Sequence, residues 1–136
     1  MTLPFFVYGT LRPGEHNHDL FLRGRTASEE PGRLRGAVLY DGPGYPYAVE
    51  EAGGVVHGEL VTALPTAYEE LLGALDRLEE YVPGGRRNLY ERVVRDVVRA
   101  DGAVVRAWVY VAAPAVAARL RARGELVVGG DWRGRR

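Results

Sequence analysis

The stretch Tyr8-Gly9-Thr10-Leu11-Arg12-Pro13-Gly14 ends an apolar, β-prone run and turns the chain sharply. The run before it predicts a strand over Pro4–Tyr8, which stops at Gly9. A proline and a second glycine follow at once, so the strand leads into a tight loop. Backbone N–H groups at a strand end have no ladder partner and can converge on an anion. The sequence therefore predicts an anion-binding loop built mainly from backbone.

The composition predicts one globular domain. The chain has 136 residues, of which 46% are hydrophobic and 26% charged, and its formal net charge is zero. A neutral chain is not drawn to nucleic acid by bulk electrostatics. No leader pattern opens the chain and no apolar run approaches ~18 residues, so we expect no membrane partner and a cytoplasmic location. We expect the domain to span residues 1–132, with a solvated basic tail over 133–136 that carries Arg133, Arg135 and Arg136.

Missing residue types narrow the chemistry. The chain has no cysteine, which excludes thiol catalysis and thiolate metal sites. All 18 cationic residues are arginine, so lysine Schiff bases and a Walker-type lysine are excluded too. The only serine, Ser28, does not lie in a nucleophile elbow. An enzyme built from this chain must use carboxylates, three histidines, tyrosines, threonines and backbone.

The order of expected elements indicates an α+β fold, a single domain with a mixed curved sheet or small β-barrel and flanking helices. Thr66 and Glu69 have the spacing of a capping box, which predicts a helix from Thr66 to about Glu80. Short helices are also expected over Asn17–Arg23 and Pro114–Arg123, the latter ended by Gly124. The expected strands after the first are Arg33–Tyr40, Tyr45–Glu50, Val55–Leu64, Tyr90–Arg99 and Ala103–Val111.

Glu79 lies where a leucine would be expected. At about 100° per residue, it falls inside the apolar arc that Leu72 and Leu75 help to define, whereas Glu80 points away. Burial and the helix C-terminus should both raise the pKa of such a carboxyl, which suits a general acid/base. Two structural alternatives remain: the helix frays before Glu79, or an arginine pairs with it. Asp76, at the margin of the arc, is the competing candidate; it could also orient Glu79 or cap a loop.

Other polar residues give weaker signals. His16 and His18 flank Asn17 and could ligate a metal or a ligand, but no third ligand is suggested and a solvated loop is the simpler interpretation. His57 and Glu59 share a strand face and form an ordinary strand pair. Tyr110 could direct its hydroxyl into a pocket or pack in the core. Trp132 is expected to cover an apolar surface.

Several landmarks, taken together and in order, resemble the γ-glutamyl cyclotransferase-like (AIG2-like) family. Each is weak alone, but they cover nearly the whole chain. They are the loop Tyr8–Gly14 followed by Asn17, the strand Gly36–Tyr40 with Tyr45-Pro46, Val56-His57-Gly58-Glu59-Leu60, Leu75-Asp76-Arg77-Leu78-Glu79, Tyr90-Glu91-Arg92, Ala107-Trp108-Val109-Tyr110 and Gly130-Asp131-Trp132.

The resemblance implies a function as well as a fold. It implies a small-molecule γ-glutamyl substrate held by Tyr8, Gly9, Thr10 and Leu11, largely through backbone amides. It implies that Glu79 is the general acid/base.

By the same resemblance Tyr110 lines the pocket and no cofactor or metal is needed. The substrate amine would attack its own γ-carbonyl, forming 5-oxoproline and releasing an amine or amino acid. One departure is Glu80, where many members have glycine. An acyl-removing enzyme of secondary metabolism and a non-catalytic binder remain alternatives, and the leaving group and oligomeric state stay open.

Overall fold

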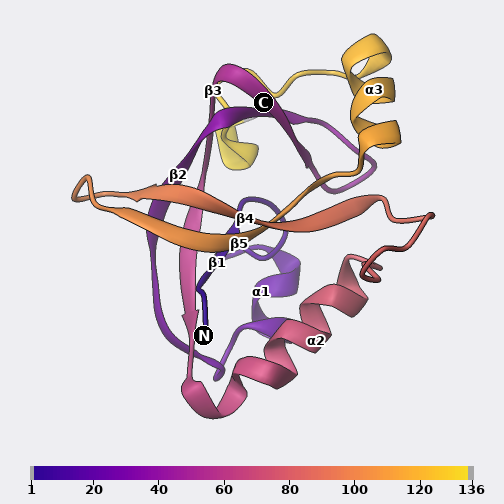
Figure 1. Ribbon diagram of the computed structural model, residues 1–136. Coiled ribbons are helices and arrows are strands. Elements are labelled where there is room, and N and C mark those ends of the chain that lie inside the picture. The colour runs from indigo at the N-terminus through magenta and orange to yellow at the C-terminus, as the bar shows by residue number, and fades with distance from the viewer. Residues whose placement is uncertain (1, 135–136) are drawn as a thin grey trace.

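The computed structural model describes residues 2–134, which form a closed five-stranded barrel with flanking helices (Figure 1). β5 and β1 pair in parallel through Trp108 and Phe5, and every other neighbouring pair is antiparallel. This confirms the expected α+β fold. The strands, in the order β1-β3-β2-β4-β5 around the barrel, are β1 (Phe5–Val7), β2 (Thr26–Tyr40), β3 (Tyr47–Ala63), β4 (Tyr90–Arg99) and β5 (Val104–Ala112).

Two segments that were expected as separate strands form one continuous strand. The segments expected as Tyr45–Glu50 and Val55–Leu64 are joined in β3, which passes through Gly53 and Gly54. Gly54 permits this because a Cβ there would lie 2.2 Å from the carbonyl oxygen of Ala37 on β2. β2 likewise starts at Thr26, well before the expected start at Arg33.

The helix that carries Glu79, α2 (Tyr68–Leu78), starts later than expected. The predicted capping box is wrong: Thr66 lies in the 3₁₀ turn η1 (Pro65–Ala67), and no side chain caps α2. The turn begins with Pro65 at its first position, so Ala67 takes the cap position.

The end of α2 fixes the direction of the chain around Glu79. Glu79 is the C-cap, and Glu80 follows with a φ of 53°, in the left-handed region. The Tyr81 N–H donates to the Asp76 carbonyl at 2.8 Å and the Glu80 N–H to the Arg77 carbonyl at 3.2 Å. These two bonds form a Schellman motif. The helix therefore does not fray before it reaches Glu79.

The two remaining helices are close to their expected bounds. α1 spans His16–Phe21 instead of Asn17–Arg23, and α3 (Pro114–Arg123) is as expected, ending at Gly124. Trp132 begins a second 3₁₀ turn, η2 (Trp132–Gly134), which also contains Arg133 of the expected tail; residues 135–136 lie outside the described part. No helix within residues 2–134 is long and apolar enough to cross a membrane.

Alternate residues of β1 enter two apolar clusters, as the period of a strand requires. Phe5 packs with Leu71 and Leu75 of α2 in one cluster. Phe6 belongs to the other, where Trp132 is 2% exposed. Trp132 therefore covers apolar surface, as expected, and β1 joins α2 to the rest of the barrel.

Candidate active site

One small cavity collects the site residues singled out in the sequence. Its volume is about 50 Å³. Glu79 comes from the end of α2, the loop Tyr8–Leu11 follows β1, and Tyr110 comes from β5. Segments far apart in sequence thus meet at one place. The lining residues are Phe6, Val7, Tyr8, Gly9, Thr10, Leu11, Tyr45, Pro46, Glu79, Tyr90 and Tyr110.

The loop after β1 is fixed by hydrogen bonds that leave several of its amides free. The Arg12 N–H donates to the Gly9 carbonyl at 3.1 Å, and the Asn17 N–H donates to the Thr10 carbonyl at 3.0 Å. The Asn17 side-chain amide also donates to the Thr10 hydroxyl at 2.9 Å. Within residues 2–134, no protein acceptor meets the N–H groups of Gly9, Thr10 or Leu11. Such amides beside a cavity fit a carboxylate or an oxyanion.

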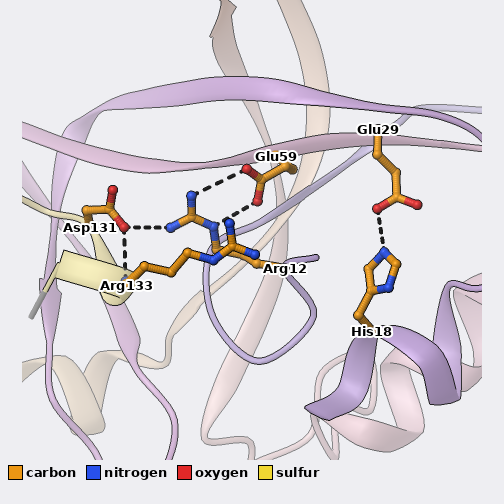
Figure 2. A network of polar contacts seen from close by, with 6 residues as sticks. All are labelled: Arg12, His18, Glu29, Glu59, Asp131 and Arg133. Atoms are coloured by element: carbon orange, nitrogen blue, oxygen red, sulfur yellow. Dashed lines mark hydrogen bonds and ion pairs between the residues drawn. The ribbon is translucent and has the colours of Figure 1, made fainter. Parts of the chain in front are cut away.

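The far side of the loop is clamped by Arg12. Figure 2 shows its guanidinium between two carboxylates: Nε donates to Glu59 at 2.8 Å and Nη1 to Asp131 at 2.7 Å. Burial acts to raise the pKa of Asp131, but the hydrogen bonds from Arg12 and the Arg133 N–H outweigh it and hold this pKa below its usual range. Arg12 is 6% exposed, so the clamp is a buried one. Glu59 therefore pairs with Arg12 and not, as expected, with His57 on its own strand.

Glu79 is a half-buried carboxylate without a polar partner. Among the described residues, its side chain makes no hydrogen bond or ion pair, so no arginine pairs with it. Burial raises the pKa of Glu79 from 4.5 to about 7. A carboxyl that titrates near neutral pH can both accept and donate a proton under ordinary conditions.

Tyrosine hydroxyls around the cavity are engaged by the protein. The Tyr8 hydroxyl donates to the Tyr110 carbonyl at 2.5 Å and accepts from the Ala48 N–H at 3.2 Å. The Tyr90 hydroxyl donates to the Pro46 carbonyl at 2.8 Å. Burial, the largest cause in each case, raises the pKa of Tyr8, Tyr90 and Tyr110 well above the usual range. These tyrosines stay protonated and act as walls.

Tyr45, Pro46 and Tyr90 complete the cavity but were not predicted as site residues. The sequence did contain a signal, because Tyr45-Pro46 and the start of Tyr90-Glu91-Arg92 are landmarks of the family resemblance. Their place beside Glu79 depends on β3 and β4 meeting the loop in space. Neither periodicity nor spacing contains that information.

Asp76 lies outside the cavity lining, although it was the competing candidate. Its Oδ1 accepts from Arg92 Nε at 2.9 Å and from the Tyr110 hydroxyl at 2.5 Å. One oxygen of this carboxylate is therefore held by two protein groups. Of the two candidates, Glu79 is the one that faces the cavity.

His16 and His18 both belong to α1. His18 lies against Glu29, with Nε2 and Oε1 2.6 Å apart (Figure 2). Neither His18 nor His16 lies in a solvated loop, because α1 begins at His16. No group of three or more potential metal ligands occurs in the part of the chain that the structure describes.

A second, larger cavity adjoins the first. Its volume is about 240 Å³, and it shares Thr10, Tyr45, Glu79 and Tyr90 with the inner cavity. Glu79 therefore lies at the boundary of two spaces. The other residues of this outer cavity are His16, Asn17, Gly44, Leu78, Glu80 and Leu89.

A half-buried carboxylate and the loop after β1 line one cavity. Comparison with known proteins decides the family. The profile of the family described as gamma-glutamyl cyclotransferase, AIG2-like, matches residues 5–134. The chain belongs to this family.

Two proteins named as γ-glutamyl cyclotransferases, one of them as putative, are similar to the chain. The gamma-L-glutamyl-butirosin B gamma-glutamyl cyclotransferase of Niallia circulans is 37% identical over 78% of this chain and 64% of its own length. A putative gamma-glutamylcyclotransferase of Halalkalibacterium halodurans is 48% identical over 41% of this chain and 49% of its own length. The chain thus matches less than two thirds of the length of either relative.

A solved structure agrees with this family. The crystal structure of an AIG2-like protein from Mus musculus covers 84% of this chain and 81% of its own, at 25% identity and a TM-score of 0.62. The γ-glutamyl cyclotransferase fold therefore extends over most of the chain.

Proposed function

We propose that this chain is a γ-glutamyl cyclotransferase that releases an amine from a γ-glutamyl amide and forms 5-oxoproline, without a cofactor, in the cytoplasm. The observation that carries the proposal is the pairing of an unpartnered carboxylate, Glu79, with the free amides of Gly9–Leu11 around one cavity. Membership of the family and the names of both relatives support the same reaction class.

The proposed reaction uses Glu79 as a proton shuttle. Glu79, with its pKa near 7, accepts a proton from the α-ammonium of the substrate. The freed amine attacks the γ-carbonyl carbon, which forms the ring C–N bond and places negative charge on the carbonyl oxygen. The original amide C–N bond then breaks as Glu79 gives its proton to the departing nitrogen. The ring nitrogen still has to lose a second proton, which Glu79 accepts and passes to the released amine, so the amine leaves as an ammonium and Glu79 returns to its carboxylate form.

In this proposal, the loop amides hold the substrate. N–H groups of Gly9, Thr10 and Leu11 would bind the α-carboxylate or the developing oxyanion, where fixed donors stabilise charge without reorganising. Tyrosine rings wall the cavity and keep the glutamyl chain folded, which accelerates ring closure by proximity. Tyr110 would contribute its ring, since its hydroxyl is already bound to Asp76.

The two cavities suggest a division of the substrate. The inner space of about 50 Å³ suits the narrow glutamyl chain, and the outer space of about 240 Å³ would receive the leaving group. Glu79 lies between them, where the amide nitrogen would be. An amine-bearing small molecule larger than a single amino acid is the proposed leaving group. The Niallia relative, named for a γ-glutamyl-butirosin, favours this choice.

Product analysis tests the proposal. Purified protein is incubated with γ-glutamyl amides of several amines, and 5-oxoproline, glutamate and free amine are quantified. We expect 5-oxoproline and amine in equal amounts, and loss of about a hundredfold or more of the rate in Glu79→Gln. Glu69→Gln, an exposed position on the same helix, is the matched control and should keep full activity.

Other products would point to the alternatives. Glutamate in place of 5-oxoproline would indicate hydrolytic removal of the γ-glutamyl group. Binding heat without any product would indicate a non-catalytic binder. Full activity in Glu79→Gln would remove Glu79 from the mechanism.

A further inference from the structure

A largely buried ion pair contacts the wall of the proposed active site. Arg92 of β4 and Asp76 of α2 pair at 2.9 Å, with side chains that are 13% and 19% exposed. The same Asp76 oxygen accepts the Tyr110 hydroxyl at 2.5 Å. Tyr110 lines the inner cavity with Glu79, so one carboxylate connects the ion pair to the cavity wall.

Arg92 is held by aromatic rings as well as by charge. Its guanidinium carbon lies 4.3 Å from the centroid of the Trp108 ring and 5.3 Å from that of Tyr81. Trp108 is itself fixed, because its indole N–H donates to the Tyr68 hydroxyl at 2.9 Å. Such stacking favours arginine over lysine, whose ammonium has no planar face. Arg92 is therefore held by two rings and by Asp76, and Asp76 is held by Arg92 and by the Tyr110 hydroxyl.

The pair lies close to Glu79. Asp76 precedes Glu79 by one helical turn, a spacing that brings side chains to about 5–6 Å between Cβ atoms. The ionisable groups that line the two cavities with Glu79, or on which its charge acts, come from every neighbouring element: Tyr8 after β1, His16 of α1, Tyr45 before β3, Tyr47 of β3, Glu80 after α2, Tyr90 of β4 and Tyr110 of β5. Among these residues none is an arginine.

We propose that Asp76 and Arg92 are positioning residues for Glu79: Asp76 holds the Tyr110 hydroxyl away from Glu79, and Arg92 cancels the charge of Asp76 one turn from Glu79. The inference rests on the proposed function, since it explains how Glu79 is kept free to move a proton. In the structure the charges balance, and burial is the cause that raises the pKa of Glu79.

Removing Arg92 and removing Asp76 should shift the pKa of Glu79 in opposite directions. In Arg92→Gln, the uncompensated Asp76 disfavours a second negative charge, so the pKa of Glu79 rises above about 7. In Asp76→Asn, the uncompensated Arg92 favours the carboxylate, so the pKa falls. Each change should be about half to one pH unit for charges at this range. In the double variant, which carries both Arg92→Gln and Asp76→Asn, the pKa of Glu79 should be close to that of the wild type.

The decisive measurement is a ¹³C NMR titration of the Glu79 side-chain carboxyl, with the pH–rate profile of 5-oxoproline release beside it. Arg95→Gln is the matched control, because Arg95 lies on the same strand and forms an exposed ion pair with Glu50 at 2.8 Å. It should leave the Glu79 titration unchanged. Arg92→Lys keeps the charge and should also leave it nearly unchanged.

Opposite shifts in the two single variants support the inference. Shifts of the same sign, or no shift, would overturn it. If Asp76→Asn does not fold, the contrast between Arg92→Gln and Arg92→Lys decides the matter alone. The NMR titration needs no turnover, so a protein without cyclotransferase activity would defeat the proposed function while the charge inference is still tested.

Discussion

Gly9 and Pro46 pack directly against each other in the wall of the inner cavity. A Cβ on residue 9 would lie 2.7 Å from Pro46 Cδ and 2.8 Å from Pro46 Cγ. Pro46 is buried and its own carbonyl accepts the Tyr90 hydroxyl at 2.8 Å, so the ring has little room to move. The glycine thus lets the loop pack closely against Pro46 beside the cavity that both residues line.

Gly9→Ala should therefore displace the loop. We expect a stability cost of about 1–3 kcal/mol from overpacking and a loss of about tenfold or more in 5-oxoproline formation, since small displacements of binding groups are costly. Urea denaturation and product assays measure the two effects. Gly73→Ala in α2, where a Cβ would meet only Arg77 Nη1 at 3.4 Å, is the control and should be tolerated. Adding Pro46→Ala to Gly9→Ala should recover activity, and no recovery would contradict a steric cause.

Glu79 should make the protein less stable at higher pH. Its pKa is raised from 4.5 to about 7, so between these values the folded protein binds more protons than the unfolded chain. The free energy of unfolding therefore falls as the pH rises through this window, by roughly 3 kcal/mol. Glu79→Gln should lack this fall and should be more stable than the wild type at pH 8. Denaturant titrations across this pH window test it, and parallel curves for both proteins would show that Glu79 is not desolvated in the fold.

Glu80 should be replaceable by glycine with a gain in stability. Its φ of 53° costs an L-residue about 1 kcal/mol, whereas glycine adopts this region without strain. Because glycine also loses more entropy on folding, we expect a net gain below about 1 kcal/mol for Glu80→Gly. Glu80→Ala keeps the strain and is the control. Thermal unfolding of both variants decides whether the gain comes from the backbone.

Arg12→Gln should be strongly destabilising. It leaves Glu59 buried without its cation and removes the link to Asp131, for which a loss of about 3 kcal/mol is expected. Arg95→Gln breaks an exposed ion pair and should cost less than about 1 kcal/mol. Equal effects of the two substitutions on urea unfolding would indicate that the Arg12 clamp does not carry stability.

The fold class and Glu79 could be predicted from local pattern. Alternation within strands and the apolar arc of α2 are local properties, so a carboxylate out of place on a helix is visible in the sequence. The continuity of β3 was missed because Gly53-Gly54 is typical of a turn, whereas Gly54 serves the close approach of β2. The helix start was missed because the tight turn at Pro65 competes with the capping box at Thr66.

Relations between distant segments could not be predicted. The Arg12–Glu59–Asp131 clamp and the Asp76–Arg92 pair each join residues from separate elements, and their partners are chosen by the barrel topology. The family resemblance supplied the landmarks around Tyr45 and Tyr90 without their roles.

The contacts of Arg12 with Glu59 and Asp131 also restrict the order in which they can form during synthesis of the chain. Arg12 and Asp131 are 119 residues apart, so a chain made from its N-terminus exposes the loop long before its last carboxylate exists. Until then the Arg12 guanidinium has at most Glu59 as a partner, and Glu59 itself needs β3 in place. The hydrogen bonds that hold the loop after β1 through Arg12 are thus complete only when synthesis has passed Asp131.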